Sequence, residues 1–151
     1  MTAAPRTAEQ RRRDVLALLA SPNLDGWVAS APDDGPAHMV PLSVAWVEEH
    51  LVIAIERTSP TARNIEAAGR ARLGFGSTRD VVMVDAELVM SVAVARAAPT
   101  LAAGFAAQAD WDPRGTSGYR FLVLAPRRIQ AWREAGEIAG RTLMVGGHWK
   151  T

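Results

Sequence analysis

Short β-type runs separated by turns dominate the hydrophobic pattern of the chain. Apolar, β-branched or alternating stretches predict strands, as do the turn residues between them. The predicted strands are Leu24–Ser30, His38–Val47, Leu51–Ile55, Ala71–Gly76, Val81–Val94, and Tyr119–Leu124 with a continuation at Ile129–Trp132 after a break. The first two form an antiparallel hairpin around the turn residues Pro32–Pro36. The pattern favours a closed or split antiparallel barrel over a parallel α/β sheet.

Helical patterns occur at three places between these strands. Thr7–Gln10 fits a capping box and opens a short helix over about residues 7–21. Pro99–Ala109 is rich in alanine and has apolar residues at helical spacing. A third helix begins at Ser59, which is followed by proline, and ends at Gly69. We therefore expect a mainly β protein with inserted helices, an α+β arrangement.

The two faces of His38–Val47 differ in size. The even positions carry mostly large side chains, whereas the odd positions, such as Pro41, Ser43 and Ala45, are mainly smaller or polar. We interpret this alternation as two faces with different functions. After the last predicted strand, glycines punctuate a tail over about residues 136–151, which predicts a weak final strand or a segment packed on the barrel.

Composition narrows the class of protein. We expect residues 1–151 to form a single domain, long enough for one core, and the formal net charge of +1 gives no general argument for binding nucleic acid or an acidic membrane. There is no cysteine, which excludes disulfides, thiolate nucleophiles and cysteine-ligated metals. The basic N-terminal segment lacks the pattern of a signal peptide, and the alanine-rich region 86–109 is too interrupted to span a bilayer. A cytoplasmic protein is expected.

The segment Thr58–Asn64 has the chemistry of an anion site. With Ser59 as N-cap, the unpaired backbone N–H groups of Thr61 and Ala62 are expected to point outward at the start of the helix. The hydroxyl groups of Thr58 and Thr61 and the guanidinium of Arg63 lie close by in sequence. These donors fit a phosphate, and an ordinary capped surface helix with an exposed arginine is the alternative.

Residues for acid–base, nucleophilic or metal catalysis are scarce. The histidines are His38, His50 and His148, and none has the helical spacing of a metal-binding pair. No phosphate-binding P-loop and no Gly-x-Gly-x-x-Gly turn follows a strand. We therefore predict no catalytic side chain and no metal site.

The order of several segments resembles the pyridoxamine 5′-phosphate oxidase-like split-barrel family. The segments that carry this resemblance are Gly26–Ser30, Gly35–Trp46, Thr61–Ile65 and Pro126–Trp132. Each motif is short, so their order and spacing carry the resemblance, which covers roughly residues 16–132. It implies a six-stranded antiparallel split barrel and a homodimer with FMN, or the deazaflavin F420, at the subunit interface.

The resemblance also implies which residues hold the cofactor. The flavin ring would lie against the second strand, at Val40, Pro41, Leu42, Ser43 and Val44. The phosphate would bind at the opening of the helix, through Thr58, Ser59, Thr61, Arg63 and Asn64. Further contributions from a partner subunit are open at four positions, Trp111, Trp132, Arg141 and Trp149.

An FMN-dependent oxidoreductase acting on a small, planar or conjugated substrate is the leading hypothesis. A closely related alternative is an F420-dependent reductase of the same fold. A second class is a non-catalytic carrier or sensor for flavin or haem, and a third is a barrel that has lost its ligand and serves as an interaction module. The cofactor would do the redox chemistry, so no protein acid or base is required.

Overall fold

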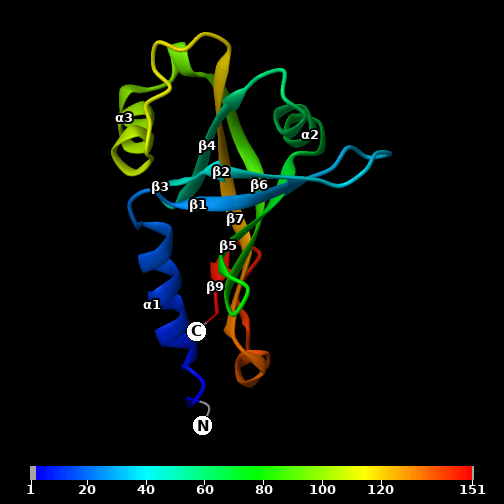
Figure 1. Ribbon diagram of the computed structural model, residues 1–151, viewed down its shortest axis with the longest axis vertical. Helices are drawn as coiled ribbons and strands as arrows, with labels where there is room; N and C mark the ends of the chain where they lie inside the picture. Colours follow the sequence, from blue (N-terminus) through cyan, green and yellow to red (C-terminus); the bar gives the residue numbers. More distant parts are fainter. Residues whose placement is uncertain (1–2, 151) are drawn as a thin grey trace.

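The computed structural model describes residues 3–150, and an antiparallel sheet forms most of it (Figure 1). The helices are α1 (Ala8–Leu19), α2 (Pro60–Ala68) and α3 (Pro99–Gln108), with short 3-10 turns at Val94–Arg96 and Ala135–Glu137. The strands are β1 (Asp25–Ser30), β2 (His38–Ser43), β3 (Ala45–Val47), β4 (His50–Glu56), β5 (Arg70–Ser77), β6 (Asp80–Ala93), β7 (Tyr119–Arg133), β8 (Thr142–Val145) and β9 (His148–Trp149).

The strands follow one hydrogen-bonded path, in the order β2-β1-β5-β6-β7-β4-β3. Strand β8 pairs with β7, β9 pairs with β8, and every pairing between strands is antiparallel. The strands curl around a packed interior, and α2 and α3 lie near its upper end (Figure 1). The prediction of a mainly β barrel with inserted helices is confirmed.

Residues 3–150 contain nine strands, whereas the sequence predicted six. The run His38–Val47 is interrupted at Val44, whose N–H donates to the carbonyl oxygen of Leu24 at 2.9 Å. In contrast, β7 continues through the predicted break, and Arg127 is an extra residue in a bulge opposite Asp85 and Ala86. The glycine-rich tail forms two short strands because the turn at Gly146 and Gly147 adopts positive φ angles of 60° and 82°.

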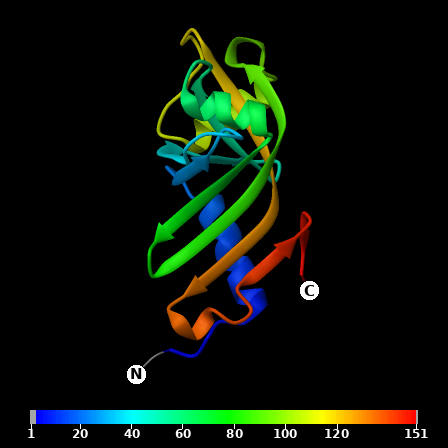
Figure 2. The same ribbon diagram turned by 90° about the vertical axis from the view of Figure 1, so that its right-hand side faces the viewer.

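Helix α1 has the predicted capping box and lies beside β7 and β8, below the barrel (Figure 2). The side chain of Thr7 accepts from the N–H of Gln10 at 3.1 Å, and the Gln10 side chain accepts from the N–H of Thr7 at 2.8 Å. None of the helices in residues 3–150 is both long enough and apolar enough to cross a membrane.

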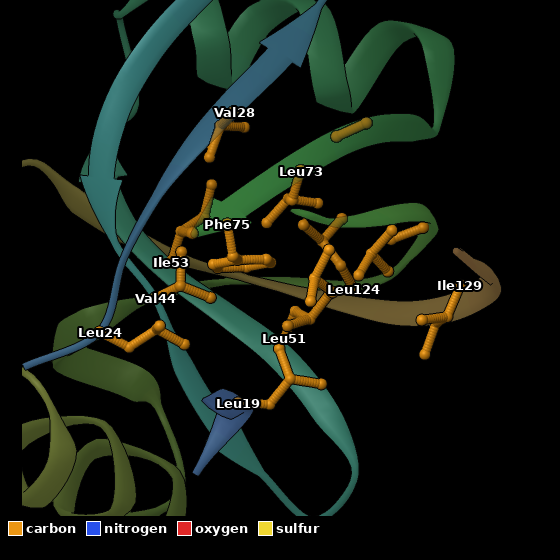
Figure 3. Close-up of a cluster of buried hydrophobic side chains, with 14 of the residues drawn as sticks. Leu19, Leu24, Val28, Val44, Leu51, Ile53, Leu73, Phe75, Leu124 and Ile129 are labelled. Carbon is orange, nitrogen blue, oxygen red and sulfur yellow. The ribbon is translucent and has the colours of Figure 1, made fainter. Parts of the chain in front are cut away.

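Two hydrophobic clusters fill the interior. The larger one includes Val28, Leu51, Leu73 and Leu124, whose side chains converge inside the curled sheet (Figure 3). The smaller cluster lies under α3 and includes Phe105 and Phe121, with ring centroids 5.4 Å apart. Alternate residues of β1, β2 and β5 point away from the larger cluster, and that outer face carries part of the candidate site.

Candidate functional site

The opening of α2 is built as the sequence predicted. Ser59 is the N-cap, and its hydroxyl oxygen accepts from the N–H of Ala62 at 3.2 Å. Pro60 occupies the first turn, where its missing N–H costs no intrahelical hydrogen bond. Gly69 ends the helix with a φ of 74°, a conformation that glycine adopts without strain.

The donors at this helix end are fewer than predicted. The N–H of Ala62 is bound by the Ser59 hydroxyl, so the expectation of an outward, unpaired N–H at Ala62 is wrong. The side chain of Thr61 packs into the protein and is only 1% exposed. Thr58 and Arg63 are exposed, and among residues 3–150 no ion pair or side-chain hydrogen bond engages the Arg63 guanidinium. The accessible donors of the helix opening are therefore a hydroxyl and a guanidinium.

Asn64 fixes α2 to the sheet. Its amide nitrogen donates to the hydroxyl of Ser30 at 3.3 Å, and Ser30 is paired with His38 at the start of β2. Ala62 and Ile65 insert into the larger core cluster. The second turn of α2 therefore lies next to the beginning of β2, as a shared site would require, and β2 runs away from α2 toward β3 (Figure 1).

Of the five predicted ring-binding residues, four alternate between the two faces of β2, and the fifth lies in the gap between β2 and β3. Val40 and Leu42 are half-buried and alternate with the exposed Pro41, whereas Val44 lies between β2 and β3 and is fully buried in the core. Pro41 is tolerated because β2 is the edge strand of the path. Ser43 is half-buried and pairs with Asp25. Only the face with Pro41 and Ser43 is directed to the outside of the sheet.

An apolar hollow of about 450 Å³ lies on this outer face. We call it the outer hollow; its main lining residues are Trp27, Met39, Gly74, Val81, Met83 and Trp132. Trp27 and Met39 are 52% and 61% exposed, which is unusual for side chains of this size. At the floor, a Cβ on Gly74 would approach the sulfur of Met83 to 3.2 Å, so a larger residue would begin to fill the hollow.

The register of the strands aligns this hollow with β2. Trp27 is paired with Pro41 on one side and with Gly74 on the other, and Gly74 is paired with Met83. Residues paired directly across an antiparallel sheet share a face. The small face of β2 and the outer hollow therefore form one continuous surface, whereas α2 packs on the opposite face through its core residues.

Sequence reasoning found only part of this surface. The sequence leaves Trp132 open for a cofactor contact from a partner subunit, but it does not indicate a role for Trp27, Met39 or Met83. Large apolar residues occupy outward positions of β1, β2 and β6, but only the pairing of these strands with one another and with β5 brings them to one surface. Of the other open positions, Trp111 packs against Phe105 and Tyr119, Trp149 lies under Arg12, and the Arg141 guanidinium donates to the carbonyl oxygen of Ile138.

The charged residue that lines the outer hollow is paired. Arg72, at the rim of the outer hollow, contacts Asp85 through its Nε at 2.6 Å, and this hydrogen bond raises the pKa of the guanidinium. Within residues 3–150, no three metal-binding side chains come together. The outer hollow thus offers mainly apolar contacts for binding.

Comparisons with known proteins identify the fold. No family model matches the chain, and no curated protein matches it. Among solved structures, an F420 reductase matches with a TM-score of 0.61 at 18% identity, over 75% of this chain and 93% of its own. ChuZ from Campylobacter jejuni matches with a TM-score of 0.73 at 13% identity, over 96% of this chain and 66% of its own.

A heme binding protein from Mycobacterium smegmatis matches with a TM-score of 0.62 at 18% identity, over 97% of this chain and 60% of its own. The chain therefore spans no more than about two thirds of the last two proteins. The shared fold is the split barrel of the pyridoxamine 5′-phosphate oxidase-like proteins. Its members differ in the group they bind, so the fold alone leaves the ligand of this chain undetermined.

Proposed function

We propose that this chain is a flavin-dependent oxidoreductase that binds FMN between two copies of itself. The observation that carries the proposal is the outer hollow, an apolar surface with two tryptophans that continues onto the small face of β2. A planar ring system fits such a surface, because aromatic side chains stack on flat rings and the small residues leave room beside them. The shared fold supports the same assignment.

The residues at the opening of α2 fit a phosphate group. Thr58 and Arg63 would hold it through a hydroxyl and a charge-assisted hydrogen bond, near the N-terminus of α2, whose dipole favours an anion. Ser59 and Asn64 would keep the helix in place, by capping it and by binding Ser30. Pro41 and Ser43 would face the ring with their small side chains, and Val40 and Leu42 would contribute only their backbone. The buried residues Thr61 and Val44 would support these contacts from the core.

A second copy would complete the site. Within one chain, α2 packs on the inner face of the sheet and the outer hollow lies on the other face. A ligand that contacts both must therefore bridge two chains or wrap around the edge strand β2. The two-chain arrangement also covers Trp27 and Met39, which would otherwise remain exposed to water.

When bound, the flavin would supply hydride transfer, and the chain would bind it, orient it and shield one face of its ring. A small, planar or conjugated substrate would meet the other face. F420 is the alternative cofactor, and the similarity to an F420 reductase favours testing both. A non-catalytic carrier of flavin or haem is the second candidate function, favoured by the similarity to a heme binding protein.

The deciding experiment is a titration of the purified protein with FMN, F420 and haem, followed by absorption and fluorescence. We expect saturable binding of FMN, and an approximately tenfold or larger rise in its Kd in Arg63→Ala, for loss of a charge-assisted contact. Arg13→Ala, an exposed arginine on α1, is the matched control. No saturable change with any of the three would disprove the binding hypotheses and leave an interaction module.

Two further measurements separate the remaining alternatives. Oxidation of the reduced holoprotein by oxygen or by a panel of conjugated substrates would distinguish an oxidoreductase from a carrier, which binds without turnover. Native mass spectrometry would report the number of subunits and the bound cofactor together. Met39→Lys should weaken a dimer that buries the outer hollow, because it places a charge in an apolar interface. A monomer that retains full FMN affinity would contradict the two-copy site.

A further inference from the structure

A second hollow surface lies beyond the outer hollow, at the other end of the same sheet face. One hollow of about 680 Å³ lies between the β1–β2 hairpin and the start of β5, and a neighbouring one of about 470 Å³ lies between the end of α2 and β6. They share Arg70, Asp85 and Ala86, so they form one groove, which we call the Arg70 groove. The hairpin that forms one wall extends beyond the rest of the sheet (Figure 1).

The walls of the Arg70 groove are largely small and apolar. They contain the alanines at positions 29, 31, 37, 68, 71 and 86, together with Pro32 and Leu88. Such walls cannot hydrogen-bond to a ligand, but they can cover the slender apolar body of one. The groove therefore differs from a purely electrostatic surface patch.

The groove is lined by three arginines, Arg70, Arg72 and Arg127, and by three carboxylates, Asp33, Asp85 and Glu87. Arg72 and Arg128 both approach Asp85, at 2.6 and 3.8 Å, and Arg127 contacts Glu87 at 2.8 Å. Arg70 is paired with Glu87 across the strands, but that carboxylate is bound to Arg127 instead. Among residues 3–150, no ion pair or side-chain hydrogen bond engages Arg70. An uncommitted guanidinium thus lies where the two hollows join.

We propose that the Arg70 groove binds a small amphiphilic carboxylate, with the carboxylate on Arg70 and the apolar body along the alanine-lined wall. The guanidinium fork matches the two oxygens of a carboxylate, and within residues 3–150 no carboxylate of the groove engages Arg70. The groove needs neither α2's N-terminus nor a flavin, so this site is independent of the proposed cofactor site.

The test uses three probes that separate charge from apolar contact: hexanoate, acetate and hexan-1-ol. Each is titrated into the full-length protein and followed in two-dimensional ¹H–¹⁵N NMR spectra. Hexanoate should shift the amide signals of Ala37, Gly69 and Arg70 saturably, with an affinity at least about fivefold higher than that of acetate. Hexan-1-ol should bind at least about fivefold more weakly than hexanoate.

Variants locate the site. Arg70→Ala should raise the Kd for hexanoate about three- to tenfold, because it removes a solvent-exposed charged contact. Arg63→Ala, at the opening of α2, and Arg13→Ala, on α1, should leave this Kd within about twofold of the unsubstituted protein. Both arginines are exposed, so these substitutions should preserve the fold.

Three results would overturn the proposal. Equal affinities for hexanoate and acetate would show that the alanine-lined wall does not contribute to binding. Equal affinities for hexanoate and hexan-1-ol, or an unchanged Kd in Arg70→Ala, would show that Arg70 does not bind the carboxylate. Shifts confined to α2 or to the outer hollow would place the probe elsewhere. The FMN titration above is unaffected by any of these outcomes, so the two sites can fail separately.

Discussion

Two arginines near the start of the chain, Arg6 and Arg11, and two beside α2, Arg63 and Arg70, have opposite environments. Arg6 and Arg11 are held by the C-terminal part of the chain, and together with Glu137 they form what we call the terminal latch. Arg63 and Arg70 extend from the two ends of α2 with no partner among residues 3–150. Because the chain is rich in arginine, the residue type does not distinguish structural arginines from those available to a ligand. The hydrogen-bond and ion-pair partners of each arginine make that distinction.

The terminal latch satisfies nearly all of its polar groups internally. Glu137 is 4% exposed and accepts from the backbone N–H and guanidinium of Arg6, at 2.7 and 2.8 Å, and from the N–H of Arg133 at 2.7 Å. Arg11 is 5% exposed and donates to the carbonyl oxygens of Ala131, Glu137 and Ala139. These contacts join the N-terminal segment to the tail. The polar groups of the latch are therefore already hydrogen-bonded within the protein and are not free to bind a ligand.

Glu137→Gln should have the largest effect on stability. The substitution keeps the size of the side chain but removes the buried charge that binds Arg6, so the largely buried guanidinium keeps only the exposed Asp14 as a counterion. We expect a loss of about 3 kcal/mol in the free energy of unfolding, measured by urea denaturation. Glu134→Gln changes an exposed carboxylate nearby and should cost less than about 0.5 kcal/mol. Equal losses in the two variants would show that the latch is no more than a surface ion pair.

The pH dependence of stability should report the same latch. Hydrogen bonds from Arg6 lower the pKa of Glu137 from 4.5 to about 2 in the folded protein. A depressed folded-state pKa gives stability that is present above about pH 4.5 and is lost as the pH falls toward 2. From about pH 5 to about pH 3 this group should contribute a loss of about 2 kcal/mol. Urea denaturation of Glu137→Gln across the same range should lack that component, and an unchanged slope would contradict the assignment.

Ser59→Ala tests the opposite region, at the opening of α2. It removes the hydroxyl that accepts from Ala62 N–H, and an N-cap of this kind contributes about 1 kcal/mol. Thr58→Ala, one residue earlier and exposed, should change the free energy of unfolding by less than about 0.5 kcal/mol. Both variants should weaken FMN binding if the helix opening holds the phosphate. A loss of affinity in Ser59→Ala alone would assign the effect to the cap.

The comparison of the two regions also shows what the sequence could predict. Local signals sufficed for the capping box at Thr7, the N-cap at Ser59 and the end of α2 at Gly69, because each depends on residues a few positions apart. The alternation in β2 likewise predicted two unlike faces. The sequence could not reveal that Val44 interrupts the second strand, since the carbonyl oxygen that binds its N–H belongs to Leu24.

Long-range pairing accounts for the remaining differences. The terminal latch joins residues more than a hundred positions apart, and nothing in the local pattern of Arg6, Arg11 or Glu137 indicates it. The outer hollow needs the register of β1, β5 and β6, which places Trp27 beside Gly74 and Gly74 beside Met83. Residues that meet only through strand pairing cannot be recognised from the spacing of a motif, whereas capping residues can, because they lie a few positions apart.

Arg12→Ala should have the smallest of these effects on stability. It tests an arginine that is exposed and yet contacts the C-terminal tail. Arg12 is exposed on α1, yet its guanidinium carbon lies 4.8 Å from the centre of the Trp149 ring, in a cation–π contact. Removing it should cost about 0.5 to 1 kcal/mol. Arg13→Ala, its neighbour in sequence, makes no contact of this kind among residues 3–150 and should be neutral within about 0.3 kcal/mol. If Arg63→Ala and Arg70→Ala also leave the free energy of unfolding unchanged, then these two arginines, unlike Arg12, do not stabilise the fold and can serve in ligand binding. A loss of more than about 1 kcal/mol in either of the latter two would instead give that arginine a structural role.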